Sequence, residues 1–205
     1  MRITKIEPQK RKQNRHSIYI DGKFVVGVDE EILFSFKLKE GTEITTSSLE
    51  KIIYAEEKRK VKEQALSLLS YRARSKKELT DRLKQKGTEV QCIDEVLNEL
   101  SALGLINDFE FASVWVRERG KSYGPFRLKN ELLRKGVSKE IIEKALGEFN
   151  EFELAQDIAE RWISSHKHLS EEVIKRRLFG FLARRGISYD TIKSLDIFKT
   201  TNYHE

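Results

Sequence analysis

The sequence predicts an all-α protein, an elongated crescent of three tandem three-helix repeats with a small β-hairpin extension at its N-terminus. One short helical pattern recurs three times at intervals of about 50 residues and a second recurs twice, whereas the first 45 residues have the shorter period of β-strands. The predicted segments are 1–45 for the extension, 46–105, 106–150 and 151–197 for the repeats, and 198–205 for a disordered tail.

The first recurring pattern is a short helix that ends at a glycine. Ser75 and Glu78 form a capping box at the start of one copy, and Gly87 can supply the left-handed residue that ends it. The other copies end at Gly136 and Gly186. In all three, leucines lie eight and four positions before the glycine, and a basic residue lies directly before it. This repeated spacing is typical of a tandem helical array.

The second pattern marks where the later repeats begin. Residues 108–112 and 151–155 share an acidic residue, a phenylalanine, a glutamate, an apolar residue and an alanine. Helices over 76–86 and 89–103 complete the first repeat. Trp115 and Trp162 fall in the opening helices, where core anchors are the favoured interpretation and platforms for nucleic-acid bases the alternative.

Residues 1–45 contain a predicted hairpin. An Asp-Gly pair separates the apolar segments 18–20 and 24–28, and residues 3–6 can add a third strand. Because this segment has a period of two, we expect it to be an accessory whose deletion leaves the helices folded. The basic loop 9–15 is either solvated or a phosphate-contacting finger.

A short helix and a long helix follow the hairpin. Asp29 can cap the short helix, which extends through Phe36. The long helix begins at Ser47 or Ser48 and ends near Tyr71, and it leads into the first repeat. Its middle is strongly polar, which predicts either a projecting lever or a face that packs only at its two ends.

Composition favours a soluble cytoplasmic protein with an acidic partner. The net charge is +6 and the pI is about 9.2, which suits either nucleic acid or an acidic protein surface. Cys92 is the single cysteine, so an internal disulfide is excluded and a reducing compartment is indicated. No apolar stretch reaches the length of a signal peptide or a membrane span, so we expect no membrane partner.

Nothing in the sequence indicates an enzyme, a cofactor, a metal or a small-molecule substrate. The segment 120–122 imitates a nucleotide-binding loop, but the position that requires the earlier glycine is Trp115. His166 and His168 lie two residues apart without a nearby cysteine, so a loop pair is favoured over a metal site. The acidic residues lie among bases at helix-surface spacings, and no carboxylate pair stands out as an acid and base.

The basic residues of the repeats are therefore the candidate partner-binding and DNA-binding residues. They form either a solvated surface or a ladder of positive charge that matches a long, periodic partner. Those next to the repeated glycines are expected in exposed last turns. The candidates are Arg72, Arg74, Lys76, Lys77, Arg82, Lys84 and Lys86 in the first repeat, Arg117, Arg127, Lys129, Arg134 and Lys135 in the second, and Lys175, Arg176, Arg177, Arg184 and Arg185 in the third; Arg119 and Lys121 belong to the same array.

Several of these motifs resemble the RecX family of recombination regulators. They cover about residues 46–195, whereas the extension 1–45 departs from the pattern of shorter family members and has no assigned role. The segments that carry the resemblance are 65–66, 74–79, 83–87, 111–112, 124–125, 132–136, Ala155, Leu178 and 182–186.

The resemblance implies a non-enzymatic, cytoplasmic regulator of homologous recombination and DNA repair. Such a protein would bind the RecA recombinase filament on single-stranded DNA and modulate, usually inhibit, its ATPase and strand-exchange activities. The partners implied are RecA and single-stranded DNA, with duplex DNA as a second candidate, and the ATP belongs to RecA. The alternative is a basic helical-repeat protein that binds nucleic acid without RecA.

Overall fold

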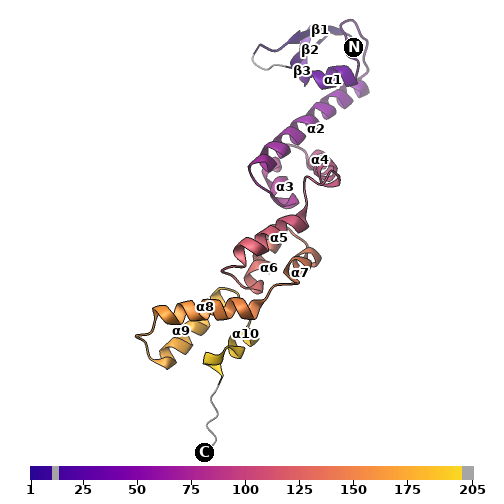
Figure 1. Cartoon of the computed structure of the whole chain (residues 1–205). Coiled ribbons are helices and arrows are strands. Elements are labelled where there is room, and N and C mark those ends of the chain that lie inside the picture. The colour runs from indigo at the N-terminus through magenta and orange to yellow at the C-terminus, as the bar shows by residue number, and fades with distance from the viewer. Residues whose placement is uncertain (11–13, 200–205) are drawn as a thin grey trace, which may run out of the picture. The chain divides into compact units, whose positions relative to one another are not determined.

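The structure is a computed structural model that describes residues 1–10 and 14–199 (Figure 1). The chain forms two compact units. The first unit comprises Met1–Arg72 and Leu79–Leu103, and the second comprises Ala73–Glu78 and the chain from Gly104 onward.

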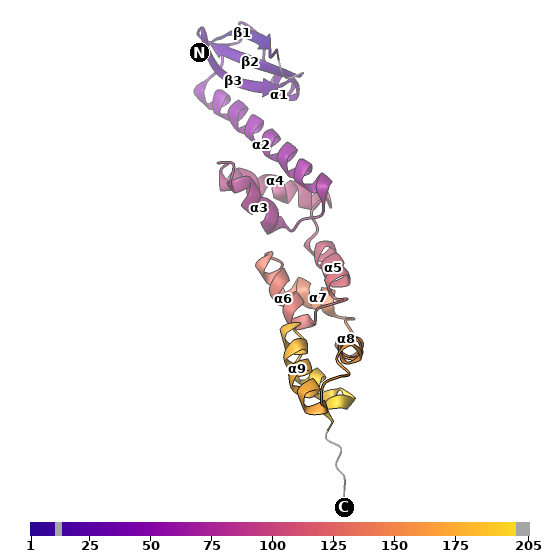
Figure 2. The same cartoon turned by 90° about the vertical axis from the view of Figure 1, so that its left-hand side faces the viewer.

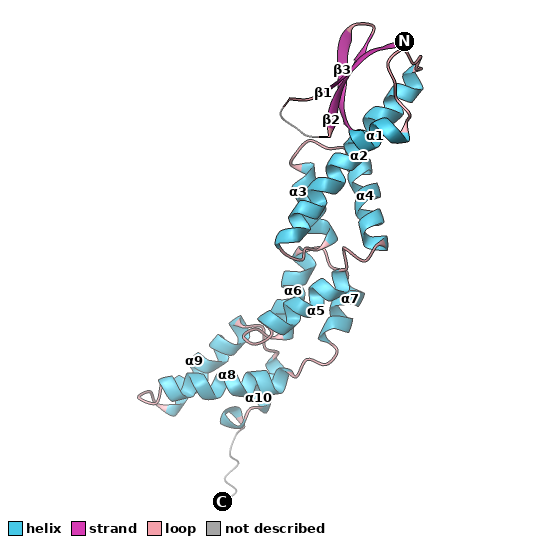
Figure 3. Ribbon diagram, turned by 45° about the horizontal axis from the view of Figure 1, so that its top comes forward, coloured by secondary structure: helices cyan, strands magenta, loops and turns pink. Residues whose placement is uncertain are grey.

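The first unit begins with a three-stranded antiparallel sheet in the order β1-β2-β3. The strands are β1 (Ile3–Pro8), β2 (Arg15–Ile20) and β3 (Lys23–Asp29), drawn in magenta in Figure 3. Asp21 and Gly22 join β2 to β3 with φ values of 49° and 78°, the conformation that Asp-Gly hairpin turns require. The predicted hairpin and third strand are confirmed. The predicted basic finger lies partly outside the described residues, because 11–13 are not described.

Two helices follow the sheet, and each begins at a capping side chain. The Asp29 carboxylate caps α1 (Glu30–Ser35), as predicted, and Phe36 ends it. The Thr45 hydroxyl caps α2 (Thr46–Tyr71), which has 26 residues. The predicted long helix is confirmed, and it begins one or two residues earlier than expected.

The sheet and the first half of α2 share one hydrophobic core. Ile3, Ile18 and Val28 of the sheet are buried together with Ile32 of α1 and Ile52 of α2. Because Ile52 is only 2% exposed, removing the sheet would uncover it. The expectation that residues 1–45 are an accessory is at odds with this shared core.

The polar middle of α2 is packed against the sheet, and the expected projecting lever is wrong. The Glu56 side chain is 1% exposed, and it accepts hydrogen bonds from Arg15 at 2.7 Å, Arg59 at 3.2 Å and the Asp29 backbone N–H at 3.0 Å. Burial alone would raise the pKa of Glu56, but these donors outweigh it and hold the pKa below its usual range. The carboxylate therefore joins α2 to two strands of the sheet.

The first unit also contains most of α3 (Lys76–Lys84) and all of α4 (Val90–Ala102). Lys58 of α2 lies 3.1 Å from Glu95 and 2.8 Å from Glu99, both on α4. Leu79 and Leu83 of α3 are fully buried, which confirms the apolar face that their spacing predicts.

The second unit contains two three-helix repeats, as predicted (Figure 2). One is packed around Leu128, Leu132 and Ile142, and the other around Leu178, Leu182 and Ile192. Residues 200–205 of the predicted disordered tail lie outside the described residues. The elements are α5 (Asp108–Arg119), α6 (Pro125–Arg134), α7 (Lys139–Leu146), α8 (Glu151–Ser165), α9 (Glu171–Arg184), α10 (Tyr189–Ser194) and the 3-10 helix η1 (Asp196–Phe198).

Both tryptophans pack against the core of their repeat, as the core-anchor interpretation predicts, and both remain half-buried. The indole N–H of Trp115 donates to Glu131 at 3.0 Å. The Trp162 ring stacks on His166 with ring centroids 3.9 Å apart. Half-buried indoles keep part of their surface available to solvent.

Candidate partner interface

Within the second unit, the N-terminus of α3 contacts the end of α6. The Ser75 hydroxyl donates to the backbone carbonyl of Lys135 at 2.6 Å, and the Lys135 ammonium lies 2.8 Å from the Glu78 carboxylate. The Lys76 backbone N–H donates to the Asp108 carboxylate at 2.9 Å. We call this set of contacts the first joint; it connects residues 75–78 at the start of α3, which belong to the second unit, to α5 and the end of α6.

A second joint connects α6 to α9 in the same way (Figure 2). The backbone N–H of Gly124, the N-cap of α6, donates to the Arg185 carbonyl at 2.9 Å, and that of Phe126 donates to the Gly186 carbonyl at 3.3 Å. The Arg185 guanidinium donates to the Ser122 carbonyl at 2.8 Å. In both joints, the residue before the repeated glycine meets the start of the preceding repeat's second helix.

The repeated glycines end helices, and two of them also allow this close approach. Gly87, Gly136 and Gly186 have φ values of 82°, 78° and 84°, a region that other residues rarely adopt. A Cβ on Gly186 would lie 2.5 Å from the backbone nitrogen of Arg127, and one on Gly136 would lie 2.5 Å from the Lys77 Cβ. A Cβ on Gly87 would have nothing within 4 Å. Only the second and third glycines therefore serve a joint.

The expectation that every base beside a repeated glycine lies in an exposed last turn is wrong for Lys135 and Arg185. The Lys135 side chain is 21% exposed and its ammonium lies 4.3 Å from the centroid of the Trp115 ring. The Arg185 guanidinium lies 4.5 Å from the centroid of the Phe181 ring. These two bases hold the repeats together, whereas Lys86 in the first repeat is exposed.

Other candidate bases are paired within the chain. Arg127 and Arg119 donate to Glu131 at 3.2 Å and 2.8 Å. Burial alone would raise the pKa of Glu131, but bonds from Arg119, Arg127 and Trp115 hold it below its usual range. The remaining paired or buried candidates are Lys129 with Glu143, Lys175 with Glu171, Arg117 with Glu118, and Arg74, which is 8% exposed.

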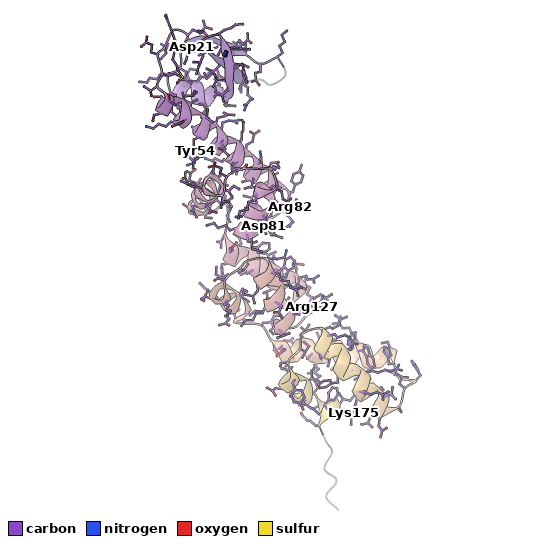
Figure 4. All side chains as sticks on the ribbon, turned by 180° about the vertical axis from the view of Figure 1, so that it is seen from behind. Asp21, Tyr54, Asp81, Arg82, Arg127 and Lys175 are labelled. Atoms are coloured by element: carbon purple, nitrogen blue, oxygen red, sulfur yellow. The ribbon has the colours of Figure 1, made fainter. Side chains whose placement is uncertain are left out.

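Exposed bases remain on the second helix of every repeat. Figure 4 labels the exposed Arg82 on α3, and it also labels Arg127 on α6 and Lys175 on α9, which are half-buried and paired. Lys76 is half-buried at the start of α3, whereas Arg117 is exposed at the end of α5 despite its partner. The other exposed candidates are Arg72, Lys77, Arg82, Lys84, Lys86, Arg134, Arg176, Arg177 and Arg184.

The structure brings Arg134 and Arg184 into one groove of about 310 Å³ beside the second joint. Both lie two residues before the repeated glycine, so they occupy equivalent positions in successive repeats. Phe126, which is 71% exposed, and Asn130 line the same groove. Arg127 and Glu131, which pair with each other, also line it. Because that carboxylate is already neutralised by its partner, the two exposed guanidinium groups beside an aromatic ring suit an anionic partner.

The described part of the chain shows no metal-binding cluster. No group of three or more histidine, cysteine or acidic side chains among residues 1–10 and 14–199 could hold a metal ion. His166 and His168 have ring centroids 6.2 Å apart. Burial raises the pKa of Cys92 to about 11, so its thiol stays protonated at neutral pH. No helix in the described residues is both long and apolar enough to span a membrane.

The chain consists of a small β-sheet domain followed by three-helix repeats, and this organisation is that of a modular helical-repeat protein. Four family models match successive segments of this chain: the regulatory protein RecX N-terminal domain over 1–45, and the first, second and third three-helix domains of RecX over 62–100, 107–146 and 150–195. The chain belongs to the RecX family of regulatory proteins. The N-terminal sheet is thus part of the family's pattern.

Known relatives agree with this assignment over most of the chain. A regulatory protein RecX of Bacillus subtilis strain 168 is 36% identical, over 94% of this chain and 75% of its own length. One of Listeria welshimeri is 33% identical, over 98% and 76%. A crystal structure of regulatory protein RecX matches with a TM-score of 0.76 and 29% identity, over 94% of this chain and 97% of that one. The structure of RecX from Lactobacillus salivarius matches with a TM-score of 0.64 and 31% identity, over 68% and 94%.

Proposed function

We propose that this chain is a non-enzymatic regulator of homologous recombination that binds the RecA filament on single-stranded DNA. By binding, it would modulate, usually inhibit, the ATPase and strand-exchange activities of RecA. The proposal is supported by membership of the RecX family. On this chain the contact would be made by the exposed bases of the repeats, and on the partner side by single-stranded DNA or by the surface of RecA.

The observation that carries the proposal is the shared groove of Arg134 and Arg184. A partner built from identical units presents the same acidic feature at regular intervals, and repeated bases can engage several of these features at once. Neither side chain takes part in a joint, so both are available without unfolding the repeats. A filament of protein on nucleic acid has the required periodicity and charge.

The test neutralises this groove without touching the joints. The double variant Arg134→Gln/Arg184→Gln should bind the RecA-coated strand about tenfold more weakly, since each lost charge contact is worth up to about 1 kcal/mol. Its affinity should also depend less on salt, because fewer charges are engaged. The matched control Lys139→Gln/Lys193→Gln removes the same charge from exposed positions on α7 and α10 and should bind like the parent.

Affinity for naked single-stranded DNA, measured at the same salt, separates the proposal from its alternative. A regulator of the filament should bind the RecA-coated strand more tightly than the naked strand and should inhibit the RecA ATPase in proportion to binding. If the double variant inhibits RecA at the parental concentration, the groove is not the contact. If the parent binds naked and coated strands equally and leaves the ATPase unchanged, a nucleic-acid-binding protein that acts without RecA is favoured.

A further inference from the structure

A separate cleft of about 310 Å³ in the second unit combines aromatic rings with positive charge. Its lining consists of two aromatic residues, three bases, two serines and an isoleucine, with no acidic residue. The aromatic residues and the bases are Trp162, Phe181, Lys121, Arg161 and Arg185. This composition favours a ligand that is both flat and anionic.

The indole in this cleft is held in position by its neighbours. The His166 ring stacks on Trp162 with an angle of 7° between the ring planes. The Phe181 ring is tilted by 41° relative to the indole, and the two ring centroids are 6.0 Å apart. The Nδ1 atom of His166 lies 2.8 Å from the Trp162 carbonyl and 2.9 Å from the Ser165 hydroxyl, so the imidazole is fixed from two sides. A pre-positioned indole loses little conformational entropy when a planar ligand stacks on it.

The positive charge in the cleft is weakly neutralised. Across the described residues, neither Arg161 nor Arg185 lies within ion-pair distance of a carboxylate, and each donates to a backbone carbonyl instead, those of Asp157 and Ser122. Lys121 lies 3.3 Å from Glu118, but both side chains are largely exposed, so that pair is weak. The cleft therefore attracts an anion next to its aromatic wall.

We propose that this cleft binds one unstacked nucleotide of single-stranded DNA, with the base against Trp162 and the phosphate near the exposed bases Arg161 and Lys121. The inference rests on the proposed function and names a subsite for the strand within it. A cleft of this size is at the lower limit of ligand pockets, which suits one nucleotide and not several. A paired base in a duplex cannot present its face to an indole, so the site selects single strands.

The experiment uses the full chain with Trp115→Phe, so that Trp162 is the only indole and reports on the cleft. The probes are a short oligothymidine and an abasic oligonucleotide with the same number of phosphates. Oligothymidine should change the Trp162 emission and bind more tightly than the abasic probe. Trp162→Ala should lower oligothymidine affinity about 10- to 100-fold and leave abasic binding nearly unchanged, because stacking is lost and charge is kept.

Two further variants keep the test decisive if Trp162→Ala folds poorly. Trp162→Phe keeps an aromatic ring and should retain part of the preference for oligothymidine. Arg161→Gln should weaken both probes by a similar factor, whereas Lys139→Gln, which lies outside the cleft, should weaken neither. Melting curves identify any variant whose fold is damaged.

Equal affinity for the two probes together with an unchanged Trp162 emission would overturn the inference. An emission change with a poly-glutamate peptide but not with oligothymidine would do the same, and it would assign the cleft to an acidic peptide. RecA ATPase inhibition by the same protein is measured separately. Inhibition with a silent Trp162 would refute this subsite and leave the proposed function in place, whereas loss of inhibition in the parent would refute the proposed function itself.

Discussion

Replacing each repeated glycine by alanine should separate helix termination from joint formation. Gly87, Gly136 and Gly186 all have positive φ, so alanine at any of them adopts a strained backbone at a cost of about 1–2 kcal/mol. At Gly87 that is the whole cost, because the space around the new methyl group is open. This substitution is therefore the internal control for the other two.

The joints add a steric cost that depends on which atoms must move. At Gly186 the new methyl group would lie 2.5 Å from the backbone nitrogen of Arg127 and 2.6 Å from its Cβ, so the start of α6 must shift. Overpacking of this kind costs about 1–3 kcal/mol, which predicts a total of about 2–5 kcal/mol for Gly186→Ala. Gly136→Ala should fall between the other two, because the side chain of Lys77 can move in part.

Chemical denaturation of the full chain, followed by circular dichroism, measures the three free energies of unfolding. Alanine also lowers the entropy of the unfolded chain, but by the same amount at each position, so differences between the variants report the joints. If Gly186→Ala and Gly87→Ala lose the same stability, the contact between α6 and α9 contributes nothing and our account of the joints is wrong.

Two further predictions concern the first unit. Glu56→Gln should lower the melting temperature at pH 7. Because the pKa of Glu56 is depressed, the stability that its carboxylate contributes is present above the usual pKa of about 4.5 and is lost as the pH falls through the folded pKa. Melting temperatures of parent and variant, measured from pH 7 to pH 3, should therefore converge in acid, and parallel curves would contradict this. Deleting residues 1–45 should uncover Ile52 and remove Arg15 from Glu56. Circular dichroism should then show a loss of helix from the first half of α2 while the second unit remains folded. An unchanged helical signal would restore the interpretation that residues 1–45 are an accessory.

Local signals in the sequence were sufficient for most helix boundaries. Asp29 accepts the capping hydrogen bond expected of it, Ser138 caps α7 in the same way, and Gly124 with Pro125 begins α6. The paired leucines before each glycine are fully buried. These features depend on residues a few positions apart, which is the range over which a helix determines its own geometry.

The burial of Glu56 could not be predicted because its partners are distant in the sequence. Arg15 lies 41 residues earlier, in a segment that looks like a solvated basic loop. A run of charges in a helix is ordinarily exposed, and only the approach of β2 and β3 makes one of them interior. In the structure Arg15 begins β2, three residues before the segment 18–20 that the sequence identifies as a strand.

The repeated base before each glycine shows how a correct pattern can predict the wrong role. Three bases at equivalent positions suggested a ladder facing a partner, yet Lys135 and Arg185 face the preceding repeat and only Lys86, which has no preceding repeat, is exposed. A feature that recurs with the repeat must first satisfy the contact that recurs with it, the joint between neighbours.

Bases that can serve a partner are then those left over after the joints are formed. Arg134 and Arg184 meet this condition, and the first repeat has Gln85 at the equivalent position. The base directly before the glycine and the base two positions before it are therefore expected to have different roles, one in stability and the other in partner binding. Neutralising Lys135 should lower stability, because it leaves Glu78 without its partner, whereas neutralising Arg134 should lower only the affinity for an anionic partner.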